Sequence, residues 1–156
     1  MKNIQSRVVL TALAIGMAGP ASAAQSDPEV IIYRFPGVRD DGGASNIGIA
    51  TVFHCSNFSG ALENVRLVTR NNNGTLLTNN SEPVGHLQTL TVSTHQVRAY
   101  SGLGFTTGQV DSGTTAIAAT SINIICTAMT IDAAAAKPAG VALRGIRFSP
   151  VPGSQE

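Results

Sequence analysis

Three histidines, His54, His86 and His95, are the side chains of this sequence best suited to bind a metal ion or transfer a proton. Side chains alternate between the two faces of a strand, so the odd spacing of His86 and His95 would turn them to opposite faces of one continuous strand. No carboxylate stands at a short spacing that would complete a metal site. We therefore predict no metal and no cofactor, and we interpret His54 as a half-buried side chain with a backbone partner.

A second candidate for chemistry is the segment Asp111-Ser112-Gly113-Thr114. An Asp followed by Ser or Thr and then Gly resembles the active-site turn of aspartic proteases. Such an enzyme needs two of these aspartates, so a chain of this length would have to dimerise. The resemblance also implies a downstream apolar-apolar-Gly segment, and the nearest match, Leu143-Arg144-Gly145, carries a charge. We favour a turn between strands, where Asp, Ser and Gly are common. A dimeric aspartic-type hydrolase using Asp111 is kept as an alternative.

The glycine-rich stretch Ser101 to Gly113 is the third candidate. Its part from Gly102 to Gly108 is similar to a dinucleotide-binding loop, but no strand, helix and acidic residue follow it in the required order. We therefore interpret it as a flexible loop. Loops that join rigid strands often carry binding surfaces, so a periplasmic protein that holds a small ligand here or between two sheets is a further alternative.

Two cysteines, Cys55 and Cys126, are an even pair without the Cys-x-x-Cys spacing of a redox motif and without a second pair to complete a zinc site. In an oxidising compartment such a pair is most simply a disulfide. The chain-entropy model gives about 4 kcal/mol of stabilisation for closing a loop of this length. The alternative is two buried thiols.

The N-terminus has the pattern of a signal peptide. Lys2 and Arg7 precede an uncharged apolar run, Val8 to Ala18, and Gly19-Pro20 then leads to Ala21-Ser22-Ala23. The run is about half of the ~20 residues that span a bilayer. We predict a leader over 1–23, cleaved after Ala23, and a single domain over 24–156. We expect a bacterial protein that is periplasmic or secreted, with no transmembrane anchor after cleavage. A buried N-terminal helix and a retained anchor are the alternatives.

Composition excludes one large class of partners. Without Lys2 and Arg7, the ten basic residues become eight against nine acidic residues, a net charge of −1. Nucleic acid binding needs a clustered basic surface, so we predict no nucleic acid partner. Charged residues are 12% of the chain, against about 25% in ordinary globular proteins. Because few charged side chains cover the surface, electrostatic repulsion between neighbouring molecules is weak, and this favours association.

Short apolar segments separated by turn residues run along the mature chain. The clearest is 47–55, in which Ile49, Thr51 and Phe53 alternate with Ala50 and Val52. The predicted strands are 30–35 (ended by Pro36-Gly37), 47–55, 64–70, a returning strand from 76 after a hairpin at Asn71 to Gly74, 87–94 with an extension over Val97 to Tyr100, 116–119, 122–131 and 141–148.

These segments, without a convincing amphipathic helix, predict an all-β fold: a small antiparallel two-sheet sandwich of about seven or eight strands, immunoglobulin-like in architecture. Cys55 and Cys126 fall in the two most apolar strands, so we expect them to bridge the facing sheets. We expect no enzyme but an exported module that binds an unknown protein or surface partner, or a second copy of itself through sheet edges.

Overall fold

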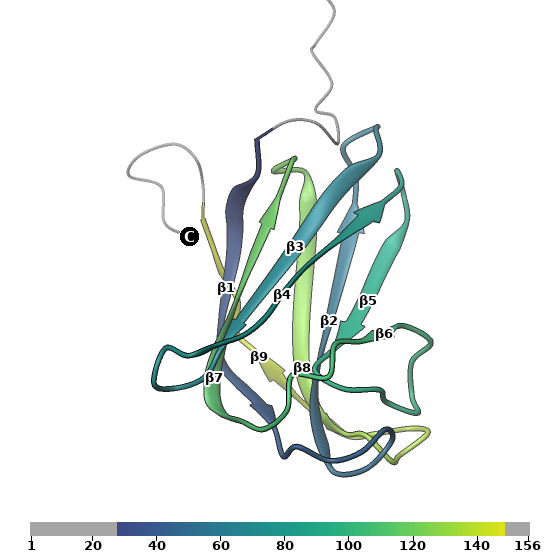
Figure 1. Cartoon of the computed structure of the whole chain (residues 1–156). Helices are drawn as coiled ribbons and strands as arrows, with labels where there is room; N and C mark the ends of the chain where they lie inside the picture. Colours follow the sequence, from purple (N-terminus) through teal and green to yellow (C-terminus); the bar gives the residue numbers. More distant parts are fainter. Residues whose placement is uncertain (1–27, 149–156) are drawn as a thin grey trace, which may run out of the picture.

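Two five-stranded β-sheets pack face to face in the computed structural model, which describes residues 28–148 (Figure 1). The strand order is β10-β1-β7-β3-β4 in the first sheet and β6-β5-β2-β8-β9 in the second. Every pairing is antiparallel except that of β5 with β6. The strands are β1 (Val30–Asp40), β2 (Ile49–Asn57), β3 (Glu63–Arg70), β4 (Leu76–Val84), β5 (Thr89–Ser93), β6 (Leu103–Gly104), β7 (Val110–Ala119), β8 (Ile124–Asp132), β9 (Gly140–Leu143) and β10 (Ile146–Arg147).

The predicted all-β, two-sheet sandwich is confirmed, while its likeness to immunoglobulin domains stays a prediction. Residues 28–148 form ten strands rather than seven or eight, because β6 and β10 have only two residues each. This part of the chain holds no helix that is long and apolar enough to cross a membrane. The predicted leader and its cleavage site after Ala23 lie outside the described residues.

The core lies between the sheets and is built on aromatic contacts. Phe35 of the first sheet meets Phe53 of the second edge to face, with ring centroids 5.8 Å apart, and Tyr33 stacks beside Phe35 at 5.7 Å. Branched aliphatic side chains from both sheets fill the space around these rings: Ile32, Val38, Val65, Leu67, Val92, Val110, Ile117 and Ile124. Burial of this apolar surface is the main force that holds the two sheets together.

Strand β2 is buried on both faces, which is unusual for an antiparallel sheet. Phe53 faces the other sheet, whereas Ala50 and Val52 belong to a second, smaller core with Val97. The segment 97–100 covers this outer face, with the Arg98 amide bonded to the Ala133 carbonyl 2.9 Å away. The predicted strand extension over Val97 to Tyr100 is therefore wrong, because the chain leaves the sheet after β5 to cover it.

Strands β1 and β7 pass through residues that the sequence predicted as breaks. Strand β1 continues past Pro36-Gly37, because a register shift there and a positive φ of 80° at Gly37 absorb the proline as a bulge. Asp111-Ser112-Gly113 lies within β7 rather than in a turn, with Ser112 at φ 54° beside another register shift. Glycine and proline thus mark bulges here, not strand ends.

The C-terminal segment changes sheets. Predicted as one strand over Val141 to Phe148, it forms β9 in the second sheet and β10 in the first. Gly145 lies at the crossing, where a Cβ atom would collide with the ring of Phe35. By contrast, the predicted hairpin between β3 and β4 is confirmed, with Gly74 at a φ of 85° in its turn.

Candidate binding surface

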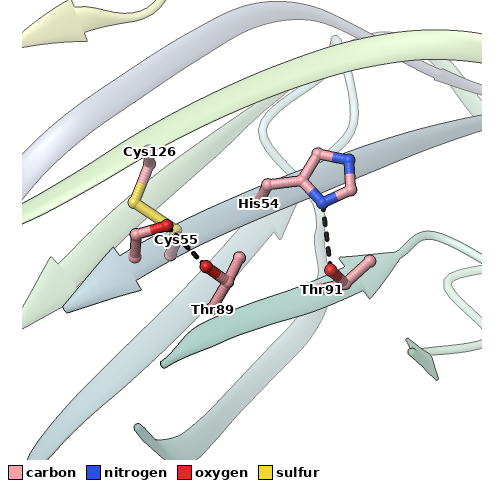
Figure 2. The surroundings of a disulfide bond; sticks show 6 residues. His54, Cys55, Thr89, Thr91 and Cys126 are labelled. Carbon is pink, nitrogen blue, oxygen red and sulfur yellow. Dashed lines mark hydrogen bonds between the residues drawn. A yellow bond between two sulfur atoms is a disulfide. The ribbon is translucent and has the colours of Figure 1, made fainter. Parts of the chain in front are cut away.

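The two cysteines lie directly opposite each other on neighbouring strands. Cys55 of β2 pairs with Cys126 of β8 in the antiparallel register, and their Cα atoms are 4.2 Å apart, joined by a disulfide (Figure 2). Both strands belong to the second sheet. The expectation that the cysteines bridge the facing sheets is therefore wrong, because β2 and β8 are neighbours in one sheet.

The three histidines have separate surroundings. His54 is half-buried, as expected, but its Nδ1 bonds the hydroxyl of Thr91 at 3.0 Å rather than a backbone group (Figure 2). Burial lowers the pKa of His54 below its ordinary value. His86 is exposed and accepts a hydrogen bond from the Gly60 amide, and His95 is buried. Within residues 28–148, no three His, Cys, Asp or Glu residues gather as metal ligands would.

Asp111 is exposed at the start of β7, and its carboxylate accepts hydrogen bonds from Gln109 Nε2 at 3.1 and 3.3 Å. The glycine-rich stretch is tied to the second sheet: Phe105 donates to Ser93 at 2.9 Å, beside the short strand β6. A Cβ atom at Gly104 would collide with the backbone of Gln96. Close backbone approach therefore explains this glycine without a ligand.

A buried polar cluster, which the sequence did not reveal, closes the end of the sandwich near the β1–β2 connection. His95 Nδ1 and Asp40 Oδ2 are 2.7 Å apart, and both side chains are almost fully buried. Asp40 also accepts hydrogen bonds from the Gly42 amide at 2.8 Å and from Thr107. His95 Nε2 has no partner among the described residues. The cluster joins three connecting segments.

The opposite end of the sandwich is formed by three connecting loops (Figure 1, top), and these loops carry exposed apolar side chains. Three loops meet there: 58–62 between β2 and β3, 85–88 between β4 and β5, and 120–123 between β7 and β8. The Phe58 amide donates to the Asn123 carbonyl at 2.9 Å, and the Leu87 amide donates to the Asn57 carbonyl at 2.8 Å, so the loops touch. We call this surface the apolar end; its members are Phe58 (52% exposed), Leu62 (48%), Leu87 (69%) and Ile122 (44%).

A fully buried asparagine holds the first two of these loops in place. Asn57 Nδ2 donates to the carbonyls of Ala61 and Val84, each at 2.8 Å, and its Oδ1 accepts from the Ser59 amide at 2.8 Å. Both amide hydrogens and the acceptor of Asn57 are thus used in fixing local backbone. A buried amide with complete partners gives the loops one defined conformation.

A buried carboxyl group anchors the third loop. Glu63 is fully buried, and its Oε2 accepts a hydrogen bond from the Thr120 hydroxyl at 2.5 Å. The same hydroxyl accepts from the Asn64 amide at 3.0 Å, so the start of β3 and the end of β7 are locked together. Glu63 Oε1 has no partner among the described residues.

Leu87 has a backbone conformation that its side chain disfavours. It lies in the turn closed by the Gln88 amide and the Gly85 carbonyl at 3.0 Å, and its φ is 60°. This third position of the turn needs a positive φ, which favours glycine or asparagine. A leucine there costs about 1–2 kcal/mol relative to an unstrained residue. Because 69% of Leu87 is exposed, packing within the domain offers little in return.

The three loops of the apolar end carry no charged side chain of their own, and a neighbouring guanidinium group, that of Arg147, donates to the Ile122 carbonyl at 2.8 Å. None of the residues in the loops 58–62, 85–88 and 120–123 is Lys, Arg, Asp or Glu. Depletion of charged residues together with aromatic and aliphatic anchors is typical of the core of a protein–protein interface. Sequence reasoning missed this surface because its members are far apart in the chain; the lack of charge in three loops was the only available signal.

No known family model, curated protein or solved structure matches this chain. The proposal on function therefore rests on its own residues.

Proposed function

We propose that this chain is an exported, non-catalytic β-sandwich module that binds a protein partner through its apolar end. The observation that carries the proposal is Leu87, an exposed leucine at a backbone position that favours glycine. Backbone strain of this kind persists where the residue has a role outside the stability of the fold. For an exposed apolar side chain on a rigid turn, that role is contact with another molecule.

A protein is favoured over a lipid bilayer as the occupant. Peripheral membrane binding by a few apolar side chains needs a second attraction, such as a basic patch facing anionic lipids. The three loops carry no Lys or Arg. Their fixed backbone, held by Asn57 and Glu63, suits instead the shape complementarity of a protein interface.

Export is supported by two features. The N-terminal pattern from Lys2 to Ala23 predicts a leader. Cys55 and Cys126 lie close enough to form a disulfide. Such a bond persists in an oxidising compartment such as the periplasm or the cell exterior.

Site-specific photo-crosslinking of the full chain in its own cells tests the proposal. A photoreactive residue at Ile122 should give a discrete adduct with one protein, and the same probe at Leu103, which is 42% exposed on the edge strand β6, should not. Adding Leu87→Gly to the chain that carries the photoreactive residue at position 122 should abolish the adduct. The purified partner should bind the Leu87→Gly variant at least about tenfold more weakly than the native chain. Equal adducts from Ile122 and Leu103, or an adduct that survives Leu87→Gly, would refute it; lipid adducts alone would favour a bilayer.

A second candidate is binding of a small anion. A hollow of about 190 Å³ on the outer face of the first sheet is lined by Arg34 and Arg70 over an apolar floor that includes Ala116. Guanidinium groups suit phosphate or carboxylate, and here the Arg34 group also lies over the Phe148 ring while Arg70 Nη1 donates to the Gly74 carbonyl. Calorimetric titration with inorganic phosphate should show binding that Arg34→Gln and Arg70→Gln each weaken and the exposed control Arg144→Gln does not. Equal titrations for all three variants would exclude this candidate.

A further inference from the structure

A cleft opens between the two sheets at the end of the sandwich opposite to the apolar end (Figure 1, bottom). Its volume is about 350 Å³, at the lower end of the range for small-molecule sites. The first sheet contributes Arg39 of β1, and the second sheet contributes Ile49 of β2, Asp132 of β8 and Val141 of β9. Strand β10 pairs only with the first half of β1, so among the described residues no strand flanks the end of β1 on this side.

The floor of the cleft is the core-facing side of the second sheet. Phe53 belongs to the main core, so by alternation Ile49 faces the same way. Val141 pairs with Thr130, which shares the face of the core residue Ala128. The first sheet does not cover this corner, and Val141 is 71% exposed. The cleft therefore presents apolar side chains to solvent.

Two opposite charges flank this apolar floor. The Arg39 guanidinium group has no hydrogen bond or ion pair with any residue in 28–148. The Asp132 carboxylate accepts one hydrogen bond, from the Ala134 amide at 2.9 Å, and meets no cation in the same part of the chain. The backbone of Arg39 is fixed, because the buried Thr51 hydroxyl accepts from its amide at 3.0 Å and donates to its carbonyl at 2.9 Å. Both charges can therefore form further hydrogen bonds from defined positions.

We propose that this cleft binds a small zwitterion with an apolar side chain, an α-amino acid or a dipeptide. The ligand carboxylate meets the guanidinium group of Arg39, whose planar N–H groups match a carboxylate. The ligand ammonium group meets the carboxylate of Asp132, and the apolar side chain covers Val141 and Ile49. A ligand with a single charge would leave Arg39 or Asp132 without a counter-charge, so the two residues favour a zwitterion over a fatty acid or an amine. The site does not depend on the partner proposed for the apolar end.

Calorimetric titration of the purified native chain with leucine and with leucyl-leucine tests the proposal. At least one of the two should bind at a one-to-one ratio at millimolar concentration. The N-acetyl form of that ligand lacks the ammonium group and its amide form lacks the carboxylate, so each should bind at least about tenfold more weakly. Glycine, which has no apolar side chain, should also bind more weakly. Binding of neither ligand, or equal binding of the zwitterion and its two blocked forms, would overturn the proposal.

Two substitutions remove one charge each and keep the local backbone contacts. Arg39→Gln leaves the amide and carbonyl at this position unchanged, and Asp132→Asn keeps an Oδ1 acceptor. Each should weaken binding at least about tenfold. The controls Arg144→Gln and Glu82→Gln change the charge by the same amounts outside the cleft and should bind like the native chain. If all four variants bind as tightly as the native chain, the ligand lies elsewhere and the proposal is wrong.

Amide NMR spectra of the native chain locate the ligand without any substitution. Titration with the ligand that binds should shift the amide signals of Thr130, Asp132 and Val141, which surround the cleft. The amide signals of Phe58 and Leu87 at the apolar end should stay in place. Shifts at the apolar end with none around the cleft would refute the proposed site.

Discussion

Replacement of Leu87 by alanine and by glycine isolates the backbone strain at the apolar end from the contacts of the leucine side chain. Both substitutions remove the same contacts, and alanine keeps the penalty of a positive φ whereas glycine relieves it. Leu76 provides the control: it is 47% exposed at the start of β4 and is not among the residues with positive φ. The difference between glycine and alanine should therefore have opposite signs at the two positions.

The magnitudes follow from exposure and φ. Full burial of a leucine side chain contributes about 2 kcal/mol, and Leu87 is 69% exposed, so Leu87→Ala should destabilise the fold by only about 0.6 kcal/mol. Compared with alanine, glycine relieves about 1–2 kcal/mol of backbone strain at this positive φ. It also costs about 0.5–1 kcal/mol, because its more flexible backbone loses more conformational entropy on folding. Leu87→Gly should thus be about 0.5–1 kcal/mol more stable than Leu87→Ala, and close to the native chain. At position 76 glycine should be less stable than alanine by about 0.5–1 kcal/mol.

Urea unfolding of the native chain and the four variants measures these differences, with the denaturant slope checked for constancy. If the glycine variant is less stable than the alanine variant at both positions, the backbone at Leu87 is not strained, and the main support for a binding role is lost. If Leu87→Ala instead destabilises the fold by more than about 2 kcal/mol, the leucine is a packing residue. Near-native stability of Leu87→Gly would show that the fold does not need this leucine.

Three further predictions address chemistry and stability. Thiol counting on the denatured, unreduced protein should find no free thiol, and two titratable thiols would contradict the pairing. Because the cysteines are 71 residues apart, replacing both by Ser should lower the free energy of unfolding by about 4 kcal/mol. Because burial lowers the pKa of His54, the unfolded chain takes up the proton at a higher pH than the folded chain does, so stability should fall as pH drops from about 7 to 5. His54→Gln should flatten this pH dependence of the melting temperature, and an unchanged dependence would contradict the prediction. Asp111→Asn should leave partner binding and melting temperature nearly unchanged, since its carboxylate contacts only Gln109 among the described residues; acid-pH peptide cleavage by the native chain alone would show catalysis.

Local features of the fold could be predicted from the sequence because they depend on neighbouring residues. The alternation from Ile49 to Cys55 indicated β2, and Asn73-Gly74 indicated the β3–β4 hairpin, since both signals lie within a few residues. Pro36 and Gly113 wrongly indicated breaks in the strands for the same reason. Each is a turn signal locally, and each lies in a bulge only because a neighbouring strand continues beside it.

The order of strands and the apolar end could not be predicted, because both depend on contacts between distant segments. Cys55 and Cys126 both lie in apolar strands, and nothing local shows that these strands are neighbours rather than facing each other. The exposure of Phe58 and Leu87 is equally non-local. Which apolar residues in loops are buried and which stay exposed depends on how the loops are placed in the fold, and the sequence alone does not give that placement.

The side chains that hold the loops in place differ in kind from those proposed to bind a partner. Buried polar groups fix the connections at both ends: Asp40 with His95 at one end, and Asn57 and Glu63 at the other. Such networks give a defined structure when their members have partners, and removing one member leaves the other buried without one. The loops therefore need neither surface charges nor apolar contacts of their own to keep their shape. A loop held in this way can carry an exposed, strained residue such as Leu87, which is the residue that the proposed external contact requires.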